Sequence, residues 1–291
     1  MVLQWLFEWP FRLLAGLLGS AAVALLAYRK KSLSGSGAWS ATVMGTAYFT
    51  LGGPVWFGTL LAFFVSSTFW SKWKKRHRAK QSAEAKYAKT GRRDWAQVWA
   101  NGGLGLALCA AHALWPDPGW LAAFAGVMAA VNADTWATEI GALSRTAPRA
   151  LLSGEPVPPG TSGGVTPLGS AAALGGAAFI GAAAAILGAA SPVAAPYAGA
   201  AAPLTGQAAA SLAVIAAAAG LAGAFADSLL GAAGQAMFRC RVCGSETERA
   251  SHCGAPTVHI RGFAWMSNDI VNLLSSAFAG LLAWCIGLWL L

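Results

Sequence analysis

Charged residues are scarce in this sequence. Only 11% of the 291 residues are charged, with 20 lysines and arginines and 11 aspartates and glutamates, whereas soluble domains average about 25%. Hydrophobic residues make up 56% of the chain, and the mean hydropathy is +0.54. This balance excludes an ordinary soluble domain and indicates an integral membrane protein.

The first 31 residues lack two features of a secretory signal peptide, a basic n-region and a small-residue cleavage site. Their apolar run is long enough to cross a bilayer, so we expect a retained first membrane span. The sequence also shows no organelle transit peptide, and we expect the protein in a bacterial plasma membrane.

Eight segments approach the roughly 20 residues that a helix needs to cross a bilayer. The sequence predicts an all-α, polytopic bundle of about eight transmembrane helices, built as a single domain over residues 1–291. The second segment is short and rich in small residues, so a partly re-entrant segment is the alternative there. The predicted spans are residues 10–28, 37–53, 55–71, 95–115, 119–143, 163–190, 207–236 and 267–290.

Basic residues are confined to alternate connections. The loops after the first, third, fifth and seventh spans hold 19 of the 20 lysines and arginines, and the opposite connections hold none. The positive-inside rule therefore places these loops in the cytoplasm and both termini outside. The net charge of +9 thus reports orientation, and we expect no nucleic-acid partner. The loop 72–93 carries ten of these residues and is expected to bind anionic membrane lipids.

Four carboxylates occur at the cytoplasmic end of the predicted bundle: Asp134 and Glu139 in the fifth span, Asp227 in the seventh and Asp269 at the start of the eighth. An ionisable group within a span is costly and usually faces a cavity or an ion path. Carboxylates with phosphates are typical ligands of Mg²⁺. We interpret Asp134 and Asp227 as magnesium ligands; Glu139 could instead be interfacial, and Asp269 could be an ordinary helix cap.

The stretch PPGTSGG (158–164) precedes the sixth span. Its glycines would let backbone N–H groups approach an anion at a helix N-terminus, with Thr161 and Ser162 as caps or hydroxyl donors and Gly163 and Gly164 as the close-approach positions. A plain loop with an N-cap is the alternative. No lysine follows the glycines, which excludes a Walker A loop.

Further polar residues occur at the mouths of the fourth and eighth spans. Asn101 and Gln97 would point into the bundle, Arg92 and Arg93 are candidate phosphate contacts, and Asn268 and Asn272 lie four apart on one helix face with Asp269 between them. Together with the acidic residues, they predict a nucleotide or phosphate site.

Five cysteines are present. Cys109 and Cys285 lie within spans and are interpreted as packing residues. Cys240, Cys243, His252 and Cys253 form a C-x2-C pair and a His-Cys pair in the last cytoplasmic loop. These residue types suit zinc, and His259 could replace His252. The alternatives are a structural zinc site, a thiol-rich loop without metal, and a catalytic cysteine.

The motifs ADTWATEIG, PPGTSGGVTPLGS, ADSLLGAAGQ, C-x2-C with HC, and SNDIVN, in this order, resemble the membrane family that contains transmembrane protein 19 and plant phytyl-phosphate kinase, catalogued as domain of unknown function 92. The resemblance covers about residues 35–291, with a weak match over 1–34. It implies a Mg²⁺-dependent kinase that transfers a phosphoryl group from a nucleoside triphosphate to an isoprenoid (prenyl or phytyl) monophosphate. A more distant similarity to CTP-dependent polyprenol kinases favours CTP.

Two other functions remain open from the residues alone. Polar and acidic groups with glycine-interrupted helices are also typical of a membrane transporter. A lipid-phosphate cytidylyltransferase would need the same metal and phosphate groups and would differ in which phosphorus atom is attacked. The oligomeric state is not indicated.

Overall fold

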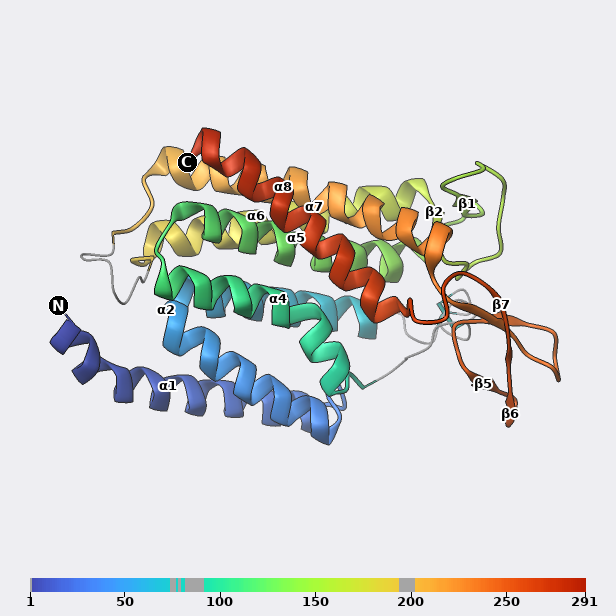
Figure 1. Ribbon diagram of the computed structural model, residues 1–291, viewed down its shortest axis with the longest axis horizontal. Coiled ribbons are helices and arrows are strands. Elements are labelled where there is room, and N and C mark those ends of the chain that lie inside the picture. Colours follow the sequence, from blue (N-terminus) through green and yellow to red (C-terminus); the bar gives the residue numbers. More distant parts are fainter. Residues whose placement is uncertain (1, 74–76, 78–79, 82–91, 194–201) are drawn as a thin grey trace.

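The protein is a bundle of long helices with small antiparallel sheets at one end (Figure 1). The computed structural model describes residues 2–73, 77, 80–81, 92–193 and 202–291. Both termini lie at one end of the bundle, and the strands lie at the other (Figure 1). This agrees with helices that alternate in direction along the chain. The helices are α1 (Val2–Arg29), α2 (Gly35–Lys72), α4 (Trp95–Leu114), α5 (Pro118–Gly141), α6 (Pro167–Ala190), α7 (Gly206–Gly234) and α8 (Asn268–Leu290).

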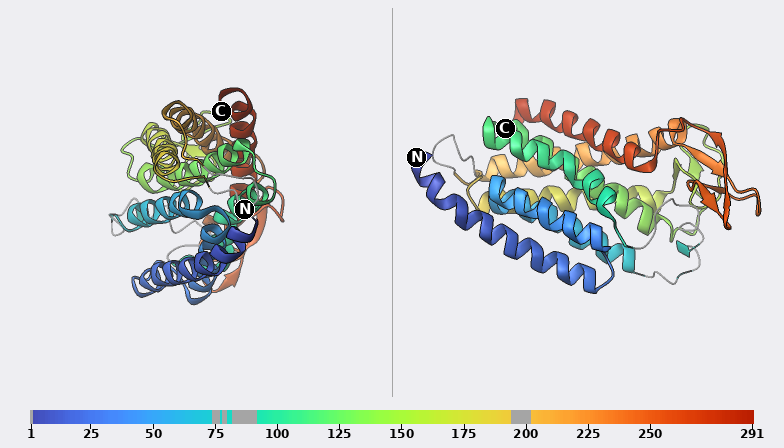
Figure 2. Two further views of the ribbon diagram at one scale, coloured as in Figure 1. Left: turned by 90° about the vertical axis from the view of Figure 1, so that its left-hand side faces the viewer. Right: turned by 60° about the horizontal axis from the view of Figure 1, so that its bottom comes forward.

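Helix α2 contains the second and third predicted spans and breaks between them. Gly53 has a non-helical backbone with φ of 69° and is followed by Pro54, which cannot continue the hydrogen-bond ladder. The two segments then run back along each other, since the rings of Phe49 and Phe57 meet edge to face at 5.7 Å. The predicted boundary between the second and third spans therefore coincides with this break, and α2 consists of two helical segments joined at Gly53. Figure 2 shows α1 and the first segment of α2 at one edge of the bundle.

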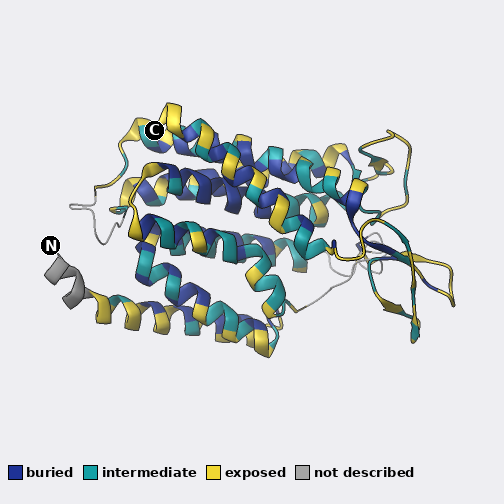
Figure 3. Ribbon diagram, in the orientation of Figure 1, coloured by how far each residue is buried: buried dark blue, intermediate teal, exposed yellow. Residues whose placement is uncertain are grey.

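Among the described residues, five helices are long and apolar enough to cross a membrane by length and composition: α1 from Trp9, α2, α6, α7 and α8. Helices α4 and α5 were predicted as spans but fall outside this set, so the count of eight spans stays a prediction. Helix α5 has a structural reason for its lower hydropathy. It packs against α2, α4, α6, α7 and α8 and is buried along most of its length (Figure 3). A helix surrounded by other helices need not be apolar toward lipid.

Small residues allow the central helices to approach closely. A Cβ added at Gly220 in α7 would lie 2.8 Å from the backbone carbon of Ala129 in α5. A Cβ at Gly126 in α5 would lie 2.8 Å from the Ala279 carbonyl oxygen in α8. Close backbone contact of this kind stabilises membrane helices, where lipid supplies no hydrophobic driving force. The glycines and alanines of α5, α7 and α8 therefore bring their polar residues together.

In the part of the chain that the structure describes, seven short strands lie in the basic connections that follow α5 and α7. One sheet pairs β1 (Arg149–Ala150) with β2 (Gly164–Val165) antiparallel. A second has the order β4-β3-β7, and β5 pairs with β6 as a hairpin. The strands after α7 are β3 (Met237–Arg239), β4 (Glu246–Thr247), β5 (Ser251–His252), β6 (Ala255–Pro256) and β7 (Val258–Arg261).

The sixth predicted span begins too early. Residues 164–165 form β2, and α6 begins at Pro167 with Thr166 as its N-cap, whose hydroxyl accepts from Gly169 N–H at 2.9 Å. Proline at the first helical position and threonine before it form a standard helix start. The prediction that Thr161 or Ser162 caps this helix is therefore wrong.

Candidate functional site

A polar cavity of about 690 Å³ opens at the end of the bundle that carries the strands. This volume lies within the range of about 300–1,000 Å³ that is common for small-molecule sites. Twelve of the thirteen residues predicted for the site line it; Arg92 is exposed and does not. The twelve are Asn101, Arg93, Asp134, Glu139, Thr161, Ser162, Gly163, Gly164, Asp227, Asn268, Asp269 and Asn272.

Asp134 and Asp227 approach each other from α5 and α7. Their charges are close enough to interact electrostatically. The Ser275 hydroxyl in α8 donates to Asp227 Oδ2 at 2.9 Å and to the Asn272 carbonyl at 3.1 Å. Asn268, Asn272 and Ser275 recur at helical spacing on one face of α8, so this spacing is the signal in the sequence that points to Ser275. Three helices thus contribute to one acidic centre.

Glu248 is a fifth carboxylate at this cavity and was missed by the sequence analysis. It lies between β4 and β5, lines the cavity, and interacts electrostatically with both Asp134 and Asp227. Its loop contains no helical or strand periodicity that points a side chain toward the membrane. The only signal was an acidic residue placed between the C-x2-C and His-Cys pairs.

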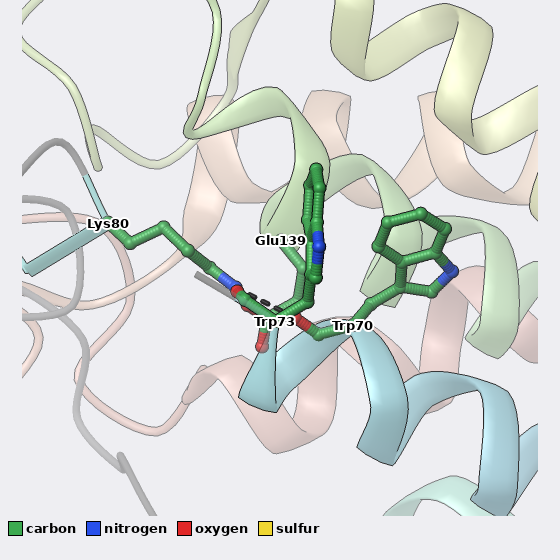
Figure 4. Close-up of polar contacts among 4 residues, drawn as sticks. All are labelled: Trp70, Trp73, Lys80 and Glu139. Carbon is green, nitrogen blue, oxygen red and sulfur yellow. Dashed lines mark hydrogen bonds and ion pairs between the residues drawn. The ribbon is translucent and has the colours of Figure 1, made fainter. Parts of the chain in front are cut away.

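Glu139 forms an ion pair with a lysine that the sequence analysis assigned to lipid headgroups. Lys80 Nζ lies 2.6 Å from Glu139 Oε2, and only 1% of the Lys80 side chain is exposed. The same ammonium donates to the carbonyls of Trp70 and Trp73 at 2.8 and 3.0 Å (Figure 4). The lipid interpretation is therefore wrong for Lys80, which the sequence does not distinguish from the other lysines of this stretch. Residues 74–76, 78–79 and 82–91 of that loop lie outside the described residues.

The glycine-rich turn packs against the end of α7. Gly163 has φ of 79°, and a Cβ there would lie against Ala232 and 2.8 Å from the Ser228 carbonyl oxygen. The Ser162 hydroxyl donates to Gln235 Oε1 at 2.8 Å. Both contacts fix the turn beside Asp227. Ser162 and Gly163 also line the cavity, so the backbone of this turn is placed where its N–H groups could reach an anion.

Arg93 connects the polar cavity to a smaller apolar pocket. Its guanidinium donates to the Ser67 hydroxyl at 3.1 Å and lies over the rings of Phe63 and Phe64. Burial lowers the pKa of Arg93 to about 10, and the charge of Glu139 opposes this effect. Arg93 therefore stays charged at neutral pH. The apolar pocket has a volume of about 70 Å³, lies between α1, α2 and α4, and shares Arg93, Gln97 and Asn101 with the polar cavity.

Asp269 and Asn268 occupy the first turn of α8. Ser267 is at the N-cap position and makes no side-chain cap bond, so Asp269 is not the cap that the sequence analysis left as an alternative. A carboxylate in the first turn is favoured by the helix dipole. Asp269 can therefore serve both the helix and the cavity that it lines.

The donor set of the cavity fits magnesium and phosphate. Asn272 Oδ1 and Gln235 Nε2 are buried and have no hydrogen-bond partner among the described residues, and both side chains line the cavity. Buried polar atoms are normally paired. An amide oxygen beside carboxylates suits a hard cation, and an amide N–H suits a phosphate oxygen.

The four predicted zinc ligands gather in the loop between α7 and α8. The ligand atoms of Cys240, Cys243, His252 and Cys253 all lie within 4.8 Å of one another. Hydrogen bonds with the Ser245 hydroxyl and backbone lower the pKa of Cys243 to about 6, and the hydrogen bond with Cys243 raises the pKa of Cys253 to about 11. His259 instead packs its ring edge to face against Phe238 at 5.5 Å, so the structure selects His252.

Comparisons with known proteins agree with the resemblance seen in the motifs. The family model described as Integral membrane protein DUF92 matches residues 18–280, a range that begins within α1. Protein PGR of Arabidopsis thaliana is 30% identical over 282 residues, which cover 91% of this chain and 92% of that protein. No solved structure matches the chain. A plant relative gives no support to the expectation of a bacterial plasma membrane.

Proposed function

The chain belongs to the DUF92 family of multi-pass integral membrane proteins, and from the residues that line its cavity we propose that it is a membrane kinase. It would transfer the terminal phosphoryl group of a nucleoside triphosphate, with CTP favoured, to an isoprenoid monophosphate. The products are a nucleoside diphosphate and the isoprenoid diphosphate. The orientation from the positive-inside rule places the cavity on the cytoplasmic side, where nucleotides are available.

One observation carries this proposal. Asp134 and Asp227 share a cavity with the glycine-rich turn and with cationic side chains. Phosphoryl transfer is catalysed chiefly by positioning and by charge stabilisation. A cavity that combines carboxylates for a metal with donors for phosphate oxygens supplies both. The cations that line it are Lys31, Lys72, Lys80, Arg93 and Arg145.

Asp134, Asp227 and the Asn272 amide oxygen would hold Mg²⁺, which when bound neutralises charge on the phosphates. The Ser162 and Gly163 N–H groups and the Gln235 amide would bind the nucleotide phosphates. The Ser275 hydroxyl orients Asp227. A phosphate monoester acceptor is largely ionised at neutral pH, so its attacking oxygen needs no strong general base.

The apolar pocket suits the first part of the isoprenoid tail. Its lining includes Ala24, Leu33, Met44 and Leu60, and its polar rim is Arg93, Gln97 and Asn101. A monophosphate held by Arg93 would lie in the polar cavity while the carbon chain enters between α1, α2 and α4. The volume of about 70 Å³ suits a short segment of the chain, and the rest would extend into lipid.

Product analysis tests the proposal. Purified protein in micelles is incubated with Mg²⁺, a panel of isoprenoid monophosphates, and CTP, ATP, GTP or UTP. Nucleoside diphosphate and isoprenoid diphosphate in equal amounts are the expected products. Release of pyrophosphate would indicate a cytidylyltransferase, and transport into vesicles without a covalent product would indicate a carrier.

A further inference from the structure

We propose that Cys240, Cys243, His252 and Cys253 bind one structural zinc ion, and that this ion fixes the segment that carries Glu248 into the polar cavity. The zinc site stands independently of any activity. The role of Glu248 as a further carboxylate for the magnesium centre rests on the proposed function.

The distances between the ligand atoms match a tetrahedral zinc site. Zinc binds sulfur at about 2.3 Å and imidazole nitrogen at about 2.0–2.1 Å, so the ligand atoms of such a site stand roughly 3.5–3.8 Å apart. His252 Nδ1 lies 3.5 Å from Cys243 Sγ and 3.2 Å from Cys253 Sγ. The whole set lies within 4.8 Å. A zinc ion would need only small shifts of these side chains.

The first ligand pair occupies the hairpin turn between β3 and β4. Val242 N–H donates to Cys240 Sγ at 3.4 Å, and Gly244 N–H donates to the Cys240 carbonyl at 3.0 Å. Gly244 has φ of 72°, which a glycine adopts without cost. These backbone hydrogen bonds hold the Cys240 sulfur in a fixed position in the turn.

The second ligand pair, His252 and Cys253, includes a residue with an unusual backbone conformation, and shared binding of one ion would explain it. Consecutive side chains of a strand point to opposite faces, so adjacent residues rarely bind one ion. Cys253 has φ of 52° and Gly254 has φ of 73°, and together they form the two-residue turn between β5 and β6. Such turns normally use asparagine, aspartate or glycine. The left-handed conformation of Cys253 brings its sulfur to the same side as the His252 ring.

Glu248 lies between the two ligand pairs, five residues after Cys243 and four before His252. The segment is further held by Thr257, whose hydroxyl donates to the Arg249 carbonyl at 2.7 Å. A zinc ion would fix both ends of this segment. Glu248 would then be held at the cavity beside Asp134 and Asp227.

Metal analysis of purified protein from zinc-supplemented cultures tests the site. About one zinc per chain is expected for the wild type. Cys243→Ser and His252→Ala should lose it, whereas the matched controls Cys285→Ser and His259→Ala should keep it. A wild-type protein without zinc, or a His252→Ala variant that retains it, would overturn the site.

Titration with Mn²⁺, followed by electron paramagnetic resonance, tests the link to Glu248. Glu248→Gln should keep its zinc and lose about tenfold or more in Mn²⁺ affinity. Cys243→Ser should lose its zinc, and its Mn²⁺ affinity should fall by the same factor as in Glu248→Gln. Unchanged Mn²⁺ affinity in either variant would overturn the link. If Cys243→Ser does not fold, wild-type protein stripped of zinc by a chelator, which is then removed, replaces it. Neither readout requires turnover, so a protein that holds zinc but transfers no phosphate would contradict only the kinase proposal.

Discussion

Lys80 and Glu139 form an ion pair of 2.6 Å between the basic loop after α2 and the end of α5. The lysine side chain is 1% exposed and the glutamate 18%. Because the Lys80 ammonium also caps two carbonyls at the end of α2, this one side chain joins two helices at the rim of the cavity.

Replacing Lys80 should destabilise the protein. Lys80→Ala removes the ion-pair partner of Glu139, and removal of one partner of a buried pair costs about 3–5 kcal/mol. Since Glu139 keeps some contact with water, we expect the free energy of unfolding, measured in micelles, to fall by about 3 kcal/mol. Lys30→Ala, an exposed lysine at the same end of the bundle, is the control.

A double-mutant cycle separates this pair from a general loss of packing. In a Glu139→Gln background, Lys80→Ala should cost clearly less than in the wild type. Equal costs in both backgrounds would show that the ion pair contributes nothing.

Gly163→Ala should impair nucleotide binding. The residue has φ of 79°, and an added Cβ would press on Ala232 and Ser228 of α7, so the turn must move away from α7 and change its position at the cavity. We expect a raised KM for the nucleotide, with little change in the KM for the acceptor.

Gly154→Ala is the matched control for that change. Gly154 also has a positive φ, 72°, but a Cβ there has open space, and the residue does not line the cavity. Both variants share a conformational cost of about 1–3 kcal/mol. If the two raise the nucleotide KM equally, the effect is strain and the turn has no specific role.

Filling the apolar pocket should affect the acceptor alone. Val98→Phe adds volume to the pocket wall in α4, and overfilling a packed apolar site costs about 1–3 kcal/mol. The KM for the isoprenoid monophosphate should rise about tenfold while the nucleotide KM stays unchanged. Val65→Phe, on the exposed face of α2, should leave both values unchanged, and an effect as large as that of Val98→Phe would argue against the pocket.

Helix positions and the acidic cluster could be predicted from the sequence. The helix positions follow from long apolar runs, and the acidic cluster follows from the scarcity of charged residues within those runs. The apolar runs located α5 and α7 to within a few residues, and charge is so scarce that Asp134 and Asp227 stood out. The alternation of basic loops placed these aspartates at one end. Their convergence in one cavity follows from those two facts.

Other contacts could not be predicted because they join segments with no periodic signal. Lys80 is one lysine among many in its loop, and only the fold shows that it is buried. Glu248 reaches the cavity through the geometry of two hairpins. The start of α6 was misplaced because the glycines before Thr166 suit a turn and a helix terminus equally well.

The central claim is that Asp134 and Asp227 hold a divalent ion together with a nucleoside triphosphate. Binding of Mn²⁺ to the wild type, Asp134→Asn and Asp227→Asn, with and without CTP, tests it most directly. Asp117→Asn is the control, since Asp117 caps the opposite end of α5 and asparagine caps equally well. We predict binding that CTP strengthens and that each cavity variant weakens by more than about tenfold, because each removes a metal ligand. Equal Mn²⁺ affinity in the wild type and both cavity variants would contradict the account.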